Sequence, residues 1–252
     1  MRKVELIGLR LPVVRPGDNL AEMIVRAGRR SGGFRNGDIL VVSSKAVATA
    51  EGRVVRLEEV RPSARARRLA VRAGISPELA EVVLGEADEI LGVGGGAVLT
   101  FKNGALCANA GVDLSNAPPG CAVLLPADPG SSAERIRREV LRATGRRIGV
   151  VISDSAVRPL RRGTIGQAIG FAGFEPVIDC RGVLDLFGRR MRLTFIALAD
   201  LLASAAELLM GETAGRIPAV IVRGVKTKLS DSPRLSPAVG RDEDLYSPIF
   251  RL

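Results

Sequence analysis

The sequence contains no histidine and no tryptophan, and it has a single tyrosine. Without histidine, no imidazole can act as a general acid or base, activate a serine nucleophile or bind a metal ion. Any metal ion must therefore sit on oxygen ligands, which favours magnesium or manganese over zinc. The scarcity of aromatic side chains also leaves few rings on which the bases of a single-stranded nucleic acid could stack.

The sequence is also poor in cysteine and in long apolar runs. Its three cysteines, Cys107, Cys121 and Cys180, have no CxxC spacing, so neither a disulfide framework nor a thiolate metal site is indicated, and we expect them to be buried. No apolar run approaches the roughly 20 residues needed to span a bilayer, and residues 1–5 lack the apolar segment of a signal peptide. These absences predict a cytoplasmic globular protein without membrane association.

Positive charge is what the chain has in excess, with 37 Lys and Arg against 27 Asp and Glu and a net charge of +10 over 252 residues. Such a charge suggests a polyanionic partner, either nucleic acid or phosphorylated small molecules. A composition bias of the source is another explanation for the arginine excess. Because aromatic rings are scarce, we favour phosphorylated small molecules over nucleic acid.

Local patterns divide the chain into short strands and amphipathic helices. Strands are expected at residues 4–9, 39–42, 53–57, 98–101, 121–125, 148–152 and 219–222, and the Asn103-Gly104 pair indicates a hairpin turn. Helices are expected after a cap at residues 17–19, at 64–73, from 76 to about 91, at 131–144 and at 193–210. Residues 226–252, rich in Ser, Pro and charge, are expected to form a mobile tail.

Polar side chains follow one of these strands where apolar residues are expected. The stretch 106–116 carries Asn109, Asp113, Ser115 and Asn116, whose oxygens are suited to holding a hard cation and the phosphates that it bridges. An Asx-capped loop, in which Asp113 and Asn116 bond nearby backbone, accounts for the same residues. Both interpretations stay open on the sequence.

Two further strand ends raise the same choice. Ser43, Ser44 and Lys45 follow the strand at 39–42 and could contact phosphate or form a solvated polar loop. Asp154, next to Ser155, follows the strand at 148–152, where it fits either a metal ligand or a helix N-cap.

Other charged and glycine-rich segments are less specific. Arg158, Arg161 and Arg162 could bind phosphate or face solvent. The glycine run at 92–96 lacks the lysine of a phosphate-binding loop and precedes a strand, so we interpret it as a flexible turn.

Three acids stand at the ends of elements in this basic protein, namely Asp113, Asp154 and Glu212. If they converge in the fold, they form an all-oxygen site that can hold magnesium or manganese against nucleotide phosphates. Spacing alone does not show whether they converge.

A set of segments, in order from about residue 4 to 224, resembles the coenzyme F420-0:gamma-glutamyl ligases, the CofE family. The matching segments are Leu11-Pro12 with Gly17-Asp18, Ala50-Glu51-Gly52-Arg53, Asn109-Ala110-Gly111-Val112-Asp113 with Ser115-Asn116, Ile152-Ser153-Asp154-Ser155, Arg161-Arg162-Gly163 with Ala168-Ile169-Gly170, and Leu208-Leu209-Met210-Gly211-Glu212 with residues 217–224.

The resemblance implies a GTP-dependent amide ligase. Such an enzyme adds L-glutamate to the carboxylate of F420-0, and then a second glutamate, through an acyl phosphate. The implied fold is α+β, with mixed or antiparallel sheets and packed helices in two intertwined subdomains, the second at roughly 110–215 of a ligase domain at 1–225. The family implies a homodimer, two Mg²⁺ or Mn²⁺ ions per site, and K⁺ as a further candidate cation.

The resemblance also assigns site residues. Asp113 and Asp154 would bind one divalent cation, and Ser155 and Glu212 the second. Arg161 and Arg162 are candidates for contacts to anionic substrates. The residues implied to line the GTP site are Leu11, Pro12, Val13, Val14, Ser44, Lys45, Asn116, Met210, Gly211, Glu212, Thr213, Ala214, Gly215, Arg216 and Ile217.

The chain departs from the family pattern at two positions. Thr49 stands where many relatives carry a lysine that contacts the nucleotide, with Lys45 as a nearby substitute. The segment Ser155-Ala156-Val157-Arg158 lacks the glycine of the Ser/Thr-x-Gly-Arg pattern that the family often shows. Two alternatives therefore stay open: a related ligase acting on another phosphorylated carboxylate, and a basic nucleic-acid-binding protein.

Overall fold

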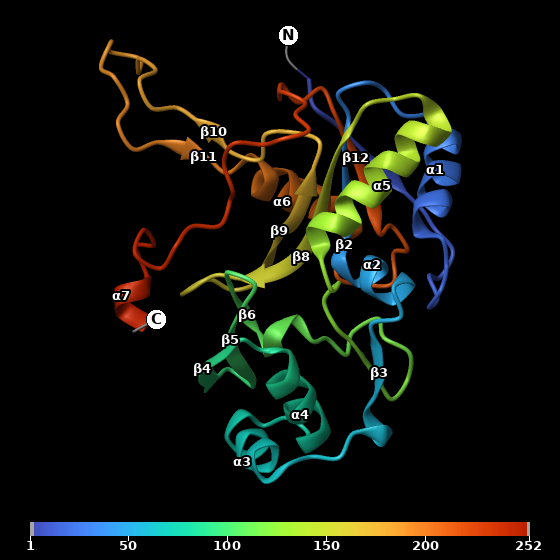
Figure 1. Ribbon diagram of the computed structural model, residues 1–252, viewed down its shortest axis with the longest axis vertical. Helices are drawn as coiled ribbons and strands as arrows, with labels where there is room; N and C mark the ends of the chain where they lie inside the picture. Colours follow the sequence, from blue (N-terminus) through green and yellow to red (C-terminus); the bar gives the residue numbers. More distant parts are fainter. Residues whose placement is uncertain (1–2, 251–252) are drawn as a thin grey trace.

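The computed structural model describes residues 3–250, which form a larger and a smaller lobe. The larger lobe contains a five-stranded sheet with helices on both faces, and the smaller lobe lies below it in Figure 1. The protein is thus α+β with mixed sheets. No helix among the described residues is long and apolar enough to cross a membrane.

The large sheet is mixed, with one parallel pair at its centre. Its strands, in order across the sheet, are β1 (Glu5–Leu9), β12 (Ala219–Arg223), β2 (Ile39–Ser43), β8 (Gly149–Val157) and β9 (Thr164–Ala172). The strands β2 and β8 run parallel, and every other neighbouring pair is antiparallel. The carboxyl ends of β2 and β8 therefore lie at the same edge of the sheet.

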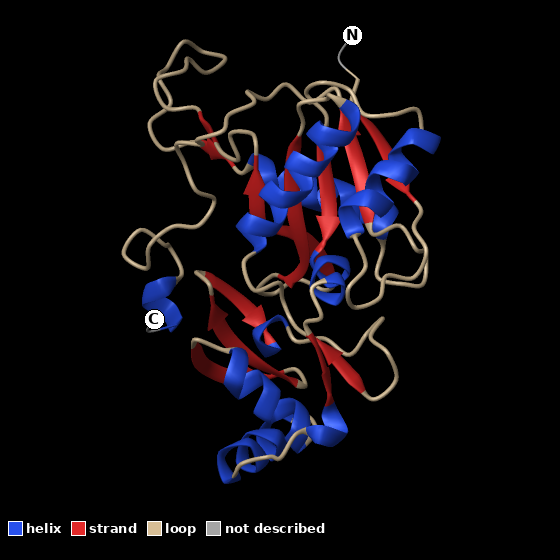
Figure 2. Cartoon of the chain, turned by 45° about the vertical axis from the view of Figure 1, so that its right-hand side comes forward, coloured by secondary structure: helices blue, strands red, loops and turns tan. Residues whose placement is uncertain are grey.

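Helices cover both faces of this sheet, as Figure 2 shows. The side chains of Leu40 and Val42 pack into a core with α1 (Leu20–Arg30) and α5 (Pro129–Thr144), whereas Ile39 and Val41 pack into a second core with α6 (Leu198–Met210). Side chains alternate across a strand, so a strand covered on both faces needs apolar residues throughout. This explains the unbroken apolar run that predicts β2.

The smaller lobe has its own core and its own sheets. It contains β3 (Val54–Arg56) paired with β7 (Cys121–Val123), an antiparallel sheet of β4 (Glu89–Gly94), β5 (Ala97–Lys102) and β6 (Ala105–Ala108), and the helices α3 (Ala64–Ala73) and α4 (Pro77–Glu86). The predicted hairpin is confirmed, because Asn103 and Gly104 form the turn with positive φ. The expected second subdomain, 110–215, contributes elements to both lobes.

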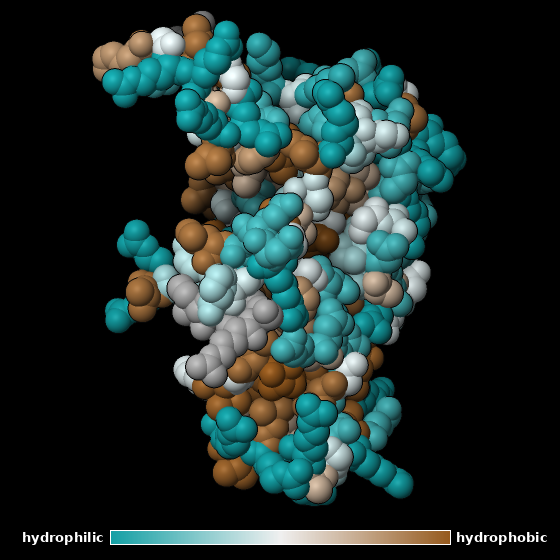
Figure 3. All heavy atoms as spheres, turned by 60° about the vertical axis from the view of Figure 1, so that its left-hand side comes forward, coloured by the Kyte–Doolittle hydropathy of each residue, from teal (hydrophilic) through white to brown (hydrophobic). Residues whose placement is uncertain are grey.

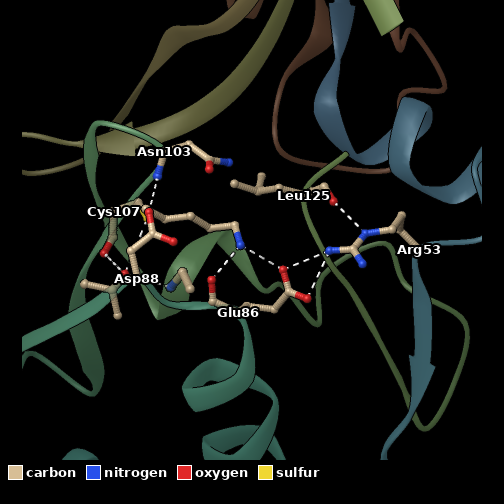
Figure 4. A network of polar contacts seen from close by, with 9 residues as sticks. Arg53, Glu86, Asp88, Asn103, Cys107 and Leu125 are labelled. Atoms are coloured by element: carbon tan, nitrogen blue, oxygen red, sulfur yellow. Dashed lines mark hydrogen bonds and ion pairs between the residues drawn. The ribbon is translucent and has the colours of Figure 1, made fainter. Parts of the chain in front are cut away.

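A polar network around Glu86 connects the smaller lobe to the chain that enters and leaves it (Figure 4). The Arg53 guanidinium donates to both Glu86 carboxylate oxygens, at 3.0 and 2.8 Å, and to the carbonyl of Leu125 at 3.1 Å. The Lys102 ammonium lies 2.9 Å from the same carboxylate. Burial alone would raise the pKa of Glu86, but these two cations outweigh it and lower the pKa. Arg53 therefore has a structural role at the junction of the lobes.

A long arm projects from the larger lobe between β10 (Ile178–Asp179) and β11 (Phe195–Ile196). The chain after β12 runs as irregular segments to the short helix α7 (Ser247–Phe250). Parts of this segment contact the rest of the molecule: Ser230 N–H donates to Gly173 O at 3.0 Å, and the Arg241 guanidinium lies 2.6 Å from Glu89.

Three elements differ from the prediction at one end, and one predicted loop is partly helical. The helix α4 ends at Glu86 rather than near residue 91, because residues 89–94 pair with β5. The helix α6 begins at Leu198 rather than 193, because Phe195 and Ile196 pair with β10. The strand β8 runs to Val157 because β9 pairs with its second half. The predicted loop at 43–45 instead leads into a helix, α2 (Ser44–Ala50). The three cysteines are unpaired and half-buried.

Candidate functional site

A pocket of about 390 Å³ opens at the edge of the large sheet where β2 and β8 end. The helix α2 starts there directly after β2, and α6 ends there at Met210. Its lining residues are Pro12, Val13, Val14, Ser43, Ser44, Lys45, Ala46, Thr49, Asn116, Ser153, Asp154, Ser155, Glu207, Met210, Gly211, Glu212, Thr213, Ala214, Arg216, Ile217 and Pro218. Segments far apart in the sequence thus meet at one place.

Most residues expected at a nucleotide line this pocket, and two do not. Leu11 is buried rather than on the pocket wall. Its N–H donates to Arg216 O at 3.1 Å, which connects the segment before residue 12 to the segment at 210–217. Gly215 also lies outside the lining. Thr49, the position of the missing family lysine, is part of the wall.

Two of the three acids expected to bind cations, Asp154 and Glu212, line this pocket, and Asp113 lies outside the lining in contact with Lys45. The Ser44 hydroxyl donates to Asp154 at 2.6 Å, and the Lys45 ammonium forms an ion pair with Asp113. The Ser155 hydroxyl donates to the Glu212 carboxylate at 2.6 Å. The structure therefore joins Asp154 to Ser44, Asp113 to Lys45 and Ser155 to Glu212.

Asp113 also satisfies the alternative interpretation of its loop. Its backbone pairs with Val123, and its carboxylate accepts from the Ser115 N–H at 2.7 Å and the Ser115 hydroxyl at 2.9 Å. The Asx-turn interpretation is thus confirmed for Asp113, whereas the Asn116 amide reaches the distant carbonyl of Glu212 at 3.4 Å. The local turn fixes the carboxylate that faces Lys45.

The structure shows neither an N-cap role for Asp154 nor a solvated loop at residues 44–45. Asp154 lies within β8, where no helix starts, so it is not an N-cap. Ser44 and Lys45 lie in the first turn of α2 and on the pocket wall rather than in a solvated loop.

The environment moves the pKa values of these acids in opposite directions. Burial raises the pKa of Asp154, and the hydrogen bond from Ser44 offsets only part of this effect. Burial would also raise the pKa of Asp113, but hydrogen bonds from Lys45 and Ser115 outweigh it, so the pKa of Asp113 is lowered. Burial and the negative charge of Glu212 raise the pKa of Glu207. The pocket thus concentrates negative charge at partly buried positions.

Sequence patterns missed several polar residues of the pocket. Thr164 donates its hydroxyl to Glu212 at 2.9 Å, and Glu207 lies on the pocket wall although its helix pattern suggests only an exposed acid on a core helix. The hydroxyl of Ser153 is buried without a hydrogen-bond partner among residues 3–250. The sequence did contain a sign of this, because Ser153 is a polar residue that directly follows the apolar run of β8, where a buried hydroxyl needs a partner.

The two arginines that are candidates for contacts to anionic substrates lie outside the pocket lining. Arg161 and Arg162 are exposed in the turn between β8 and β9, and neither lines the pocket. The glycines expected to form a flexible turn lie in β4 and in the turn after it, in the smaller lobe.

The donor atoms at the pocket are those that a hard divalent cation prefers. Every candidate donor is a carboxylate or hydroxyl oxygen, from Asp113, Asp154, Glu212, Ser44 and Ser155. In the part of the chain that the structure describes, no three His, Cys, Asp or Glu side chains cluster closely enough to hold a metal by themselves. The chemistry therefore fits magnesium or manganese held by acid pairs, hydroxyls and ligand oxygens.

Known proteins similar to this chain cover most of its length, including the pocket residues. Residues 8–224 match the family described as F420-0:Gamma-glutamyl ligase. Three relatives, each named coenzyme F420:L-glutamate ligase, cover most of the chain. The protein of Methanopyrus kandleri is 46% identical over 90% of both chains, that of Methanothermobacter thermautotrophicus is 44% identical over 88% of this chain and 89% of its own, and that of Methanocaldococcus jannaschii is 41% identical over 97% of both.

Proposed function

Since the chain belongs to the F420-0:gamma-glutamyl ligase family and is a ligase that forms C–N bonds, we propose that it joins L-glutamate to coenzyme F420-0 in a GTP-dependent reaction. The observation that supports this most is that Asp154 and Glu212 line one pocket, and that Lys45 of the same lining forms an ion pair with Asp113. A second glutamate would be added to the product of the first reaction.

The proposed reaction has two steps. The carboxylate of F420-0 attacks the γ-phosphorus of GTP, so that GDP leaves and an acyl phosphate forms. The amino group of glutamate then attacks the acyl carbon, phosphate leaves with the bonding electron pair, and the ammonium proton of glutamate is released to solvent. Both steps depend on positioning and on charge neutralisation, which a protein without histidine can supply.

The pocket residues have distinct parts in this reaction. Residues 12–14, Ser44, Lys45 and the segment 210–217 surround the nucleotide. Asp113 with Asp154, and Ser155 with Glu212, would hold two divalent cations, which supply positive charge to the triphosphate and the attacking carboxylate. K⁺ is a further candidate at the phosphates. Arg161 and Arg162 remain proposed contacts for anionic substrate beyond the pocket.

We also propose that the enzyme works as a homodimer in the cytoplasm. The arm between β10 and β11 exposes large apolar side chains, with Leu186 and Phe187 92% and 83% exposed. Exposed apolar side chains that project together are typical of protein interfaces. Figure 3 shows brown, apolar side chains on the arm at the top and over the smaller lobe.

The proposed function is tested by incubating the protein with GTP, Mg²⁺ or Mn²⁺, L-glutamate and F420-0, and measuring the mass of the deazaflavin. We expect a gain of one or two glutamyl groups and one GDP per bond formed. GTP turnover that requires neither glutamate nor F420-0, without a mass gain on the deazaflavin, would contradict the proposed function. Asp154→Asn is the control, and it should give no product.

A further inference from the structure

The protein places one of its own cations inside the acid cluster. Lys45 is the second residue of α2, and its ammonium forms an ion pair with Asp113 and donates to the Ser115 hydroxyl at 3.1 Å. Its side chain is 21% exposed, so it is held among other groups rather than extended into solvent. Asp113 itself is fixed by the backbone of Val123 and by the turn at Ser115.

The charge of Lys45 reaches beyond Asp113. It lowers the pKa of Asp154 and of Glu207, against the larger effect of their burial. The ammonium therefore compensates Asp113 by direct contact, and Asp154 and Glu207 of the pocket lining through its charge. Without it, these negative charges would repel one another in a partly buried space.

A divalent cation bound to Asp113 and Asp154 would displace the Lys45 ammonium from Asp113. Two positive ions that share one carboxylate repel each other, and the Asp113 oxygens that contact Lys45 are the same oxygens that a cation needs. The flexible four-carbon stem of lysine allows the ammonium to move by several ångströms. Since Lys45 also lines the pocket, the phosphates of a bound nucleotide are within its reach.

We propose that Lys45 is a positioning residue that neutralises Asp113 in the cation-free enzyme, leaves Asp113 when a divalent cation arrives, and then binds the phosphates of the nucleotide. This inference rests on the proposed function, because it assumes the cation and triphosphate site described above. It explains why a pocket wall with Thr49 in place of the family lysine still carries an ammonium.

The inference predicts effects of opposite sign from one substitution. In Lys45→Met, Mn²⁺ alone no longer competes with the ammonium, so its affinity should rise about fivefold to tenfold. GTP in the presence of saturating Mn²⁺ should bind about tenfold more weakly, because a charge-assisted hydrogen bond to phosphate is lost. If Lys45 only supports the structure of the pocket, both affinities should fall together.

Isothermal calorimetry on the full chain separates these outcomes, with circular dichroism as the check of folding. Lys226→Met is the matched control, because Lys226 is exposed and lies outside the pocket lining, and both affinities should stay unchanged. Lys45→Arg keeps the charge and should restore most of the GTP affinity. Unchanged or jointly reduced affinities in Lys45→Met would overturn the inference alone, whereas a wild-type protein without any Mn²⁺ binding would overturn both it and the proposed function.

Discussion

At the scale of single residues, Asp154 is an acid whose burial affects the stability of the fold. Its carboxylate is half-buried, with Ser44 as its hydrogen-bond donor, and burial raises its pKa. A carboxyl group whose pKa is higher in the folded than in the unfolded protein stabilises the fold below its unfolded pKa. That contribution is lost as the pH rises through the folded pKa. Wherever Asp154 is ionised in the folded protein, its burial therefore lowers the stability of the cation-free protein.

We predict that Asp154→Asn stabilises the cation-free protein at pH 7. Asparagine is neutral at every pH, and its amide oxygen can still accept from Ser44, so the free energy of unfolding should rise by about 1 kcal/mol. The gain should shrink as the pH falls toward the ordinary range of a carboxylic acid, where Asp154 is protonated in both states. Urea denaturation with a chelator at several pH values measures this. Equal stabilities at pH 7 would contradict the assigned environment.

The sequence indicated candidate site residues one by one, but it did not indicate which residues contact them. Asp154 and Asp113 stand out because polar residues follow apolar strands, and that signal is local. The contact of Asp113 with Lys45 depends on the position of a loop from the smaller lobe against a helix of the larger lobe, so no local pattern contains it. Glu207 was missed because an acid on an amphipathic helix resembles an ordinary solvent-facing residue.

At the scale of elements, the glycines of β9 determine how closely α6 approaches the sheet. A Cβ atom at Gly166 would overlap the backbone carbonyl of Ala203 in α6, and the Ser204 hydroxyl donates to Gly166 O at 2.8 Å. On the other side, a Cβ atom at Gly170 would lie 2.5 Å from the carbonyl carbon of Pro129 in α5. Glycine at these two positions therefore allows both helices to pack closely against β9.

We expect Gly166→Ala to destabilise the protein by about 1–3 kcal/mol, because backbone must move to admit the methyl group. Since α6 carries Glu207 and leads to Glu212, the substitution should also weaken nucleotide binding. Gly85→Ala in α4 is the matched control, because its Cβ meets no atom within 4 Å and alanine favours helix. Chemical denaturation of both variants measures their free energies of unfolding. Equal stability of Gly166→Ala and the wild type would contradict the close packing of α6 against β9 at Gly166.

Most elements could be predicted from periodicity and caps, and the errors have one cause. The helices α3 and α5 and the strand β2 follow from local patterns, with Gly145 ending α5 in the left-handed conformation as expected. The ends of α4, α6 and β8 depend on pairing with strands distant in the sequence. Hydrogen bonds to such partners override local propensity, and a single sequence does not reveal them.

At the scale of the whole molecule, the projecting arm supports the proposed homodimer. Apolar side chains at its tip have no cover within the described chain, as the exposure of Leu186 and Phe187 shows. We predict that the double substitution Leu186→Asp and Phe187→Asp converts the dimer to a monomer in light-scattering measurements. Val71→Asp, at an 85% exposed position of α3, should leave the dimer intact. A wild-type monomer, or a double variant that remains dimeric, would contradict the role of the arm.

In the proposed function, acids from three distant segments hold the cations that bind the triphosphate of GTP. Calorimetry of Mn²⁺-dependent GTP binding, for the wild type and Asp154→Asn, tests it most directly. We predict that the variant stays folded and that its GTP affinity in Mn²⁺ falls tenfold or more, on the order of 1.4 kcal/mol. An affinity equal to that of the wild type would remove Asp154 from the site and contradict the claim.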